Sequence, residues 1–235
     1  MTPLLTPSMD ESARLLAERL RAKIPTTFVR VGDGALEAIA GRPGQTCDGE
    51  RYTGELAEQL LLAIKALQAS PDVLWGDWAT ATNGSAPNHV STWQSIIAPP
   101  PDKLLHFEAL LLNRRSDALL DFYRAVRDDP RRKLIIGAEW NEAAGPLLHA
   151  NYIAVPARNL LSFRALLNSR MRSSAYEMLL FGAGLAGLVI ATDQWILHPE
   201  RTYIHLGSAF DPLYKGRTRG GQLSTYQARE WMNKL

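Results

Sequence analysis

The sequence predicts a single-domain α/β fold of the Rossmann-like kind, in which a mainly parallel sheet carries helices on both faces. Two observations predict this fold. Short segments rich in β-branched and aliphatic residues alternate with longer segments of helical periodicity along the whole chain. In addition, the 235 residues contain 46% hydrophobic and 21% charged side chains, which is typical of a globular domain with a sizeable core.

The predicted strands are short, apolar and followed by glycine or polar residues. They cover residues 26–31, 72–75, 104–107, 133–137, 152–155, 177–181 and 202–206. The predicted helices cover residues 12–24, 35–40, 55–69, 117–127, 159–171 and 185–197, and residues 76–91 are expected to form a long polar loop. Within the one domain, 1–235, residues 1–24 form an N-terminal helical segment and residues 220–235 a C-terminal helical tail. Because a parallel strand pair needs a crossover connection, the alternation predicts a parallel sheet.

Composition and charge exclude several classes of protein. A net charge of only +2 does not suit a polycation that coats nucleic acid or a membrane. The single cysteine, Cys47, excludes an internal disulfide and a cysteine-based zinc site. Residues 1–10 do not resemble a signal peptide, and no long uncharged apolar stretch follows. We therefore expect a cytoplasmic protein without a membrane span.

The first candidate site follows the strand at 26–31, where Arg30 precedes the turn Gly32-Asp33-Gly34. Parallel sheets bind ligands at the carboxyl ends of their strands, and glycines there let the backbone approach an anion closely. Asp33 is either the N-cap of the next helix or a ligand-binding group, and spacing does not decide between them. Glu37 lies one helical turn further on, so the two carboxylates can share a face and hold Mg²⁺ or Mn²⁺ against a diphosphate.

A second candidate is the glycine-rich turn after the strand at 177–181. Gly182, Gly184 and Gly187 fit the G-x-G-x-x-G fingerprint of dinucleotide-binding proteins. However, the next strand ends in His205-Leu206-Gly207, which supplies no acid for a ribose. We favour close packing of strand, helix and ligand backbone as the role of these glycines, and we keep a nucleotide-dependent oxidoreductase as the alternative.

The loop after the last strand carries Ser208, Asp211, Lys215, Arg217 and Arg219. The basic side chains are suited to bind a diphosphate, and Asp211 is suited to hold them or to accept a hydroxyl proton. The alternative is a solvated basic loop.

Two further carboxylates follow strands. Glu108 comes after the strand at 104–107, on the same face as His106 if the strand continues, and is a candidate general base, whereas His106 itself is better explained as a core histidine. Asp77 lies between Trp75 and Trp78, which offer aromatic surface for a sugar unless they belong to the core. Asp77 is therefore a secondary candidate.

Taken together, these segments resemble the bacterial and phage glycosyltransferases of the GT-D fold type. Those proteins carry a strand that ends in Arg-aromatic-Gly-Asp-Gly-Glu, followed by a short helix and then a Leu-rich helix. The corresponding segments here are residues 30–35 and 55–69, and residues 204–211 with 217–219 resemble the closing strand and loop of that family. The resemblance covers residues 25–219. It implies a nucleotide-sugar donor, usually a uridine diphosphate (UDP) sugar, and a divalent metal beside the Asp-x-Glu pair.

The sequence departs from that pattern at two positions: Val31 replaces the aromatic residue, which matters less, and Ala35 stands where the family has glutamate. Three alternatives follow. Glu37 replaces the missing acid in a Mn²⁺ or Mg²⁺ site with Asp33; or the metal is lost, and Arg217 and Arg219 neutralise the diphosphate; or the protein is inactive.

The expected function is transfer of a sugar from a nucleoside diphosphate sugar to a hydroxyl of a glycan, a protein or a modified nucleobase. Glu108 is the preferred catalytic base, ahead of Asp211 and Asp77. The expected donor-binding residues are Arg30, Gly32, Asp33, Gly34, Gly182, Gly184, Ser208, Arg217 and Arg219. A non-catalytic nucleotide-binding domain is a third possibility, and the sequence leaves open whether the chain forms a homo-oligomer.

Overall fold

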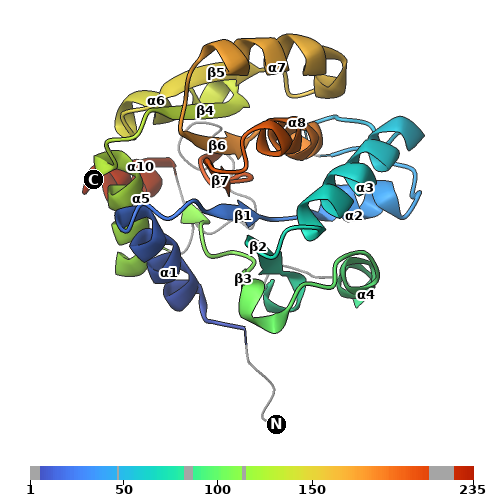
Figure 1. Cartoon of the computed structure of the whole chain (residues 1–235), viewed down its shortest axis with the longest axis horizontal. Helices are drawn as coiled ribbons and strands as arrows, with labels where there is room; N and C mark the ends of the chain where they lie inside the picture. Colours follow the sequence, from blue (N-terminus) through green and yellow to red (C-terminus); the bar gives the residue numbers. More distant parts are fainter. Residues whose placement is uncertain (1–5, 47, 82–86, 113–114, 212–224) are drawn as a thin grey trace.

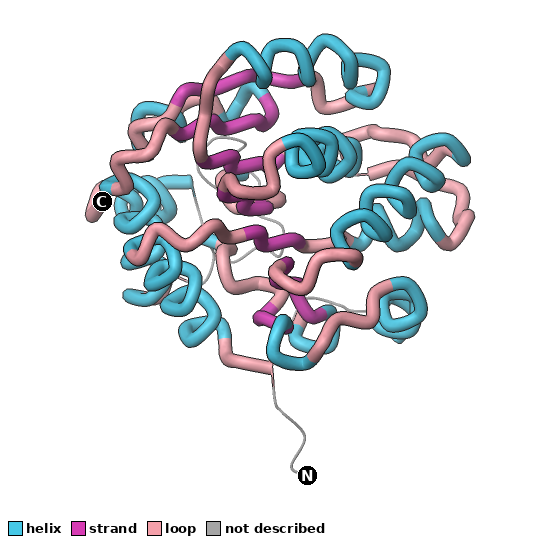
Figure 2. The backbone as a smooth tube through the Cα atoms, viewed as in Figure 1, coloured by secondary structure: helices cyan, strands magenta, loops and turns pink. Residues whose placement is uncertain are grey.

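A computed structural model of the chain describes residues 6–46, 48–81, 87–112, 115–211 and 225–235. Its centre is a seven-stranded sheet of order β3-β2-β1-β7-β6-β4-β5, in which every neighbouring pair is parallel. Figure 2 shows the strands as a central column with helices on both sides. The predicted Rossmann-like α/β fold is confirmed.

Each predicted strand is present, with small shifts at its ends. The strands are β1 Thr27–Val29, β2 Val73–Asp77, β3 Leu104–His106, β4 Lys133–Ala138, β5 Asn151–Val155, β6 Met178–Gly182 and β7 Thr202–His205. β1, β2, β4 and β7 are buried along their whole length. Strands covered on both faces need apolar side chains on both, which is why they read as continuous apolar runs in the sequence.

Helices cover both faces of the sheet. The α-helices are α1 Met9–Arg21, α2 Asp33–Ile39, α3 Gly54–Gln68, α4 Pro87–Ile96, α5 Asp117–Asp128, α6 Ala144–Leu147, α7 Arg164–Ser173, α8 Gly184–Leu197 and α10 Thr225–Met232. Short 3-10 turns are η1 Trp78–Thr80, η2 Pro101–Lys103, η4 Glu139–Asn141 and η5 Leu160–Phe163. One apolar core lies between the sheet and α2, α3, α7 and α8, and a second lies between the sheet and α1 and α5. Figure 1 shows α1, α5 and α10 on one side and α2, α3 and α8 on the other.

The way the helices begin distinguishes α8 from three others. Side-chain oxygens of Ser8, Thr53 and Ser116 accept a backbone N–H in the first turns of α1, α3 and α5. In contrast, α8 follows Ala183, and no side chain of the described residues caps its first turn. The positive end of the α8 dipole is therefore left for another acceptor.

The predicted loop at 76–91 is wrong in part. β2 continues to Asp77, η1 follows directly, and α4 begins at Pro87. Proline is favoured at the first position of a helix, and Trp93 and Ile97, one turn apart, are both buried in the core. Because most residues around these two positions are polar, the sequence pattern does not indicate a helix here. The predicted helix at 159–171 is likewise divided, into η5 and α7.

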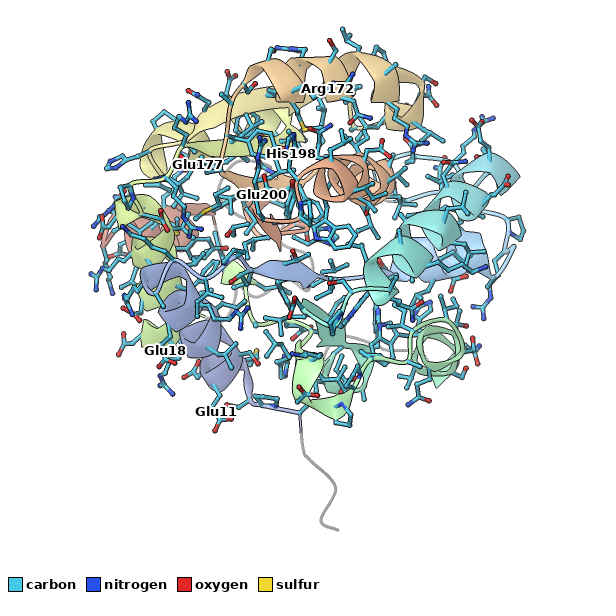
Figure 3. All side chains as sticks on the ribbon, viewed as in Figure 1. Glu11, Glu18, Arg172, Glu177, His198 and Glu200 are labelled. Atoms are coloured by element: carbon cyan, nitrogen blue, oxygen red, sulfur yellow. The ribbon has the colours of Figure 1, made fainter. Side chains whose placement is uncertain are left out.

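The two edges of the sheet differ in what they carry. Glu177 precedes β6, and His198 and Glu200 lie between α8 and β7, so all three belong to the amino edge (Figure 3). His198 Nδ1 lies 3.4 Å from the Oε1 atom of the exposed Glu200 side chain. In contrast, Arg30, Asp33, Glu108, Ser208 and Asp211 follow strands and lie at the opposite, carboxyl edge.

Candidate functional site

A cavity of about 500 Å³ opens at the carboxyl edge of the sheet. The turns after β1, β6 and β7 line it, together with residues that follow β3, β4 and β5. Seven of the expected donor-binding residues contribute to its wall: Arg30, Gly32, Asp33, Gly34, Gly182, Gly184 and Ser208. The other two, Arg217 and Arg219, lie outside the described residues.

Arg30 places a positive charge in the cavity wall. It follows β1, and only 6% of its surface is exposed. Its Nη1 donates to the carbonyl oxygen of Leu206 at 3.2 Å, and its guanidinium lies 4.5 Å from the centre of the Phe107 ring. A cation held in this way beside a cavity favours an anionic ligand, since the surrounding protein screens the charge less than water does.

The turn at Gly32 to Gly34 begins α2. Asp33 is the first residue of that helix and not its N-cap, because the N-cap is Gly32. The Asp33 carboxylate accepts the backbone N–H of Gly34 at 2.9 Å and lines the cavity. A Cβ atom on Gly34 would lie 3.2 Å from both the Leu185 Cδ2 atom and the Tyr52 hydroxyl, so glycine lets α2 approach α8 closely.

Glu37 does not lie in the cavity wall with Asp33. Its carboxylate accepts from Arg42 Nη1 at 2.8 Å and also contacts His89 Nε2, which comes from α4. The expected metal pair therefore has only one member at the cavity. Within the described ranges, no group of three or more His, Cys, Asp or Glu side chains is arranged to hold a metal ion. These residues do not fit the expected Asp33–Glu37 metal site, and no step below depends on a metal.

Two expected catalytic acids, Glu108 and Asp211, line the cavity, and both are buried. Glu108 follows β3, and only 3% of its surface is exposed. Asp211 Oδ1 accepts from Asn141 Nδ2 at 3.1 Å and from Trp140 Nε1 at 3.5 Å. These two bonds fix the orientation of the Asp211 carboxylate, which suits a positioning role.

Asp77, the third expected acid, is not among the residues that line the cavity. Its carboxylate accepts from the Thr6 hydroxyl at 2.7 Å and from the backbone N–H of Ala79 at 2.9 Å. The second bond caps η1, which begins directly after Asp77. This carboxylate connects the N-terminal segment to the end of β2 and is occupied by structural bonds.

Each glycine of the fingerprint has a reason within the fold itself. A Cβ atom on Gly182 would lie 2.6 Å from the carbonyl oxygen of Gly207, and one on Gly187 would lie 3.0 Å from the Ala183 Cβ. Gly184 has a φ of +63°, which L-residues rarely adopt. Close contacts account for Gly182 and Gly187, and the positive φ accounts for Gly184, in each case without a dinucleotide.

His205 also lines the cavity, although no sequence pattern indicated it as a site residue. It is the last residue of β7 and is 8% exposed. Its ring stacks on Phe181 with centres 4.6 Å apart, and its Nδ1 accepts the backbone N–H of Arg30 at 3.3 Å. Burial, with a smaller contribution from the Arg30 charge, lowers the pKa of His205 to about 3. The imidazole is therefore neutral at physiological pH.

The neutral state of His205 predicts a loss of stability in mild acid. The unfolded chain takes up a proton near the reference pKa of 6.5, whereas the folded chain does so only near 3, so acid favours unfolding. Between pH 6.5 and pH 5, we expect this residue alone to lower the free energy of unfolding by about 2 kcal/mol. Denaturant titrations across this range should show a shallower pH dependence for His205→Asn. An equal slope in both proteins would contradict the buried neutral state.

One wall of the cavity is closed by a contact between two loops. Glu50, 8% exposed, accepts the backbone N–H groups of Asn159 and Leu160, and Arg158 Nε donates to the carbonyl oxygen of Asp48 at 3.0 Å. Asp48 and Glu50 both line the cavity. Burial raises the pKa of the Glu50 carboxyl against these bonds.

Replacing Glu50 tests this loop contact. Glu50→Ala leaves two backbone N–H groups without their acceptor, so we expect the free energy of unfolding to fall by about 1–2 kcal/mol. Glu50→Gln keeps an acceptor oxygen and should cost clearly less at pH 7. In the native protein stability should decline as pH rises through the raised pKa of Glu50, and this decline should be absent in Glu50→Gln. Equal losses for both substitutions in urea titrations would contradict the proposed role of the acceptor.

Comparison of the chain with models of known families, with curated proteins and with solved structures finds no match. In the parts of the chain that the structure describes, no helix combines the length and apolar character needed to cross a membrane. The case for a function therefore rests on the cavity and its side chains.

Proposed function

We propose that the protein is a glycosyltransferase that moves a sugar from a nucleoside diphosphate sugar, in the first place a UDP-sugar, to an acceptor hydroxyl. The observation that carries the proposal is a single cavity that combines the buried cation Arg30 with the buried carboxylates Glu108 and Asp211. Its volume of about 500 Å³ falls in the usual range for small-molecule sites. The sequence resemblance to GT-D type glycosyltransferases supports the same function.

The diphosphate would bind in the part of the cavity where the electrostatic potential is positive. Arg30 and the uncapped start of α8 both line the cavity, and Ser208 adds a hydroxyl donor. The glycines at 32, 34, 182 and 184 let the ligand reach the backbone closely. Arg217 and Arg219 keep their predicted role on the phosphates, but they lie outside the described residues.

Glu108 would act as the general base. In the proposed reaction the acceptor hydroxyl oxygen bonds to the anomeric carbon of the sugar, and its proton passes to the Glu108 carboxylate. The bond between the anomeric carbon and the terminal phosphate oxygen breaks, and the nucleoside diphosphate leaves with the electron pair. Arg30 and the α8 N-terminus would stabilise the charge that develops on this leaving group.

A ligand screen tests the proposal against its alternatives. Thermal unfolding should be measured with UDP-sugars, GDP-sugars and NAD(H), each with and without Mn²⁺, and hydrolysis or transfer should be followed as release of nucleoside diphosphate. We expect stabilisation by a nucleotide sugar and turnover once an acceptor is supplied. Stabilisation by NAD(H) alone would favour an oxidoreductase and contradict the proposal. Binding without turnover of any glycan, protein or nucleobase acceptor would favour a non-catalytic nucleotide-binding domain.

The role of Asp33 gives a more specific test. We expect Asp33→Asn to weaken UDP binding by about tenfold, or about 1.4 kcal/mol, because the Asp33 carboxylate lines the cavity and can accept a hydroxyl of the nucleoside. Glu37→Gln is the matched control because Glu37 lies outside the cavity wall in contacts with Arg42 and His89. Calorimetry should find its UDP affinity nearly unchanged. A large loss in Glu37→Gln would instead restore the predicted Asp33–Glu37 pair.

A further inference from the structure

The hydrogen bond between Arg30 and His205 determines which ring nitrogen of the histidine carries the proton. Nδ1 accepts the backbone N–H of Arg30, so it has no proton of its own. A neutral imidazole must then carry its proton on Nε2. Stacking on Phe181 holds the ring in this orientation. His205 thus presents a fixed N–H donor.

That donor has no acceptor within the described chain. His205 lines the cavity, and none of the described residues forms a hydrogen bond with its Nε2. The side chain is more than nine-tenths buried, so the donor is directed into a site with little water around it. The described buried side-chain atoms that lack a partner do not include His205 Nε2, so this donor is open to the cavity, and a ligand oxygen can accept its N–H.

The first turn of α8 belongs to the same cavity wall as His205. Phe181, which pairs with His205 in the sheet, is followed by Gly182, and α8 begins at Gly184. The first residues of α8 line the same cavity, and within the part of the chain that the structure describes no side chain caps them. Gly182 and Gly207 are packed backbone against backbone, which keeps the β6 and β7 turns together. His205 and the first residues of α8 therefore line the same cavity, beside the paired ends of β6 and β7.

We propose that His205 Nε2–H and the N-terminus of α8 form an oxyanion subsite that binds a phosphate oxygen of the diphosphate. This subsite rests on the proposed function for the identity of its ligand. His205 contributes as an uncharged donor, and Arg30, whose backbone holds the ring, supplies the positive charge. Neutrality has a consequence for catalysis, since His205 is then a binding residue and not the acid or base of the transfer.

Two substitutions separate binding from structure. Asn places an acceptor near the position of Nδ1 and can retain the bond from the Arg30 N–H, but it loses the donor that faces the cavity. Gln places an amide near the position of Nε2 and can retain that donor, but it loses the acceptor for Arg30. The two variants therefore remove opposite halves of the histidine's function.

The experiment measures the affinity of His205→Asn and His205→Gln for inorganic pyrophosphate, UDP and uridine by calorimetry. We expect His205→Asn to bind pyrophosphate and UDP at least about tenfold more weakly, since a hydrogen bond to a charged group is worth about 1.5–3 kcal/mol. His205→Gln should stay close to the native affinity. Uridine, which lacks phosphate, should bind all three proteins alike. Thermal unfolding of each variant verifies that it is folded.

Two outcomes of this experiment would contradict the proposed subsite. Native-like pyrophosphate affinity in His205→Asn, with a loss in His205→Gln, would show that the histidine only supports Arg30 and would overturn the subsite. Pyrophosphate affinity that is unaffected by either change would do the same. If pyrophosphate binding depends on His205 as expected but no nucleotide sugar binds, the subsite stands and the proposed function fails.

Discussion

Replacing Glu108 by Gln is expected to lower the turnover of the nucleotide sugar by about 100- to 10,000-fold, the usual contribution of a positioned general base. The amide has nearly the shape of the carboxylate but cannot accept the proton of the acceptor hydroxyl. UDP affinity should remain within a factor of about three, because the base acts on the acceptor and not on the donor. The measurement is kcat from nucleoside diphosphate release at saturating donor, together with UDP affinity by calorimetry.

Asp77→Asn is the matched control for Glu108→Gln. Both residues are buried acids that end or follow neighbouring strands, but only Glu108 lines the cavity. Asp77→Asn should reduce stability through its bonds to Thr6 and Ala79 and leave kcat within a factor of about three. If Glu108→Gln kept full turnover and Asp211→Asn lost it, the base would be Asp211, the second acid of the cavity.

Gly182→Ala is expected to destabilise the fold by about 3 kcal/mol, the upper end of the usual cost of overpacking. The added methyl group would lie 2.6 Å from the carbonyl oxygen of Gly207, and both partners are backbone that cannot rotate away. The β6 and β7 turns would have to separate, which would also displace the start of α8 and His205. Urea denaturation should show the loss of stability, and pyrophosphate affinity should fall with it.

Gly32→Ala provides the comparison within the same cavity. Gly32 has an ordinary extended backbone with φ −71°, and a Cβ atom there would have no neighbour within 4 Å. We expect its stability to stay within about 0.5 kcal/mol of the native protein. Equal stability of Gly182→Ala and Gly32→Ala would mean that the turns do not need the tight backbone contact.

Much of the fold could be read from local patterns because the reasons for it are local. A run such as Lys133 to Gly137 is apolar and short, so it predicts a buried strand wherever the chain places it. The helical pattern of α4 is harder to recognise in the sequence, because its apolar positions are few and lie among polar residues. The helix exists because Trp93 and Ile97 are buried in the core, a contact that spacing alone conveys weakly.

From the rule that ligands bind at the carboxyl ends of parallel strands, we expect the candidate residues to gather at one edge, and most of them do line one cavity. That rule could not rank the acids. Asp77 and Glu108 both belong to this edge, but the bonds of Asp77 to Thr6 and Ala79 depend on a contact between distant parts of the chain. Glu37 was paired with Asp33 from helical spacing, yet His89 from the unpredicted α4 and Arg42 occupy its carboxylate.

The sequence by itself determined the parallel α/β sheet, the edge of the sheet at which the candidate residues lie and the glycine turns, because periodicity and backbone freedom are properties of short segments. Only the tertiary structure decided which side chains face the cavity and which protonation state His205 has there. His205 illustrates the difference, since its neutrality comes from burial beside Arg30, and its proton position comes from a bond that joins β7 to the end of β1. Both depend on strands that are far apart in the chain and adjacent in the sheet.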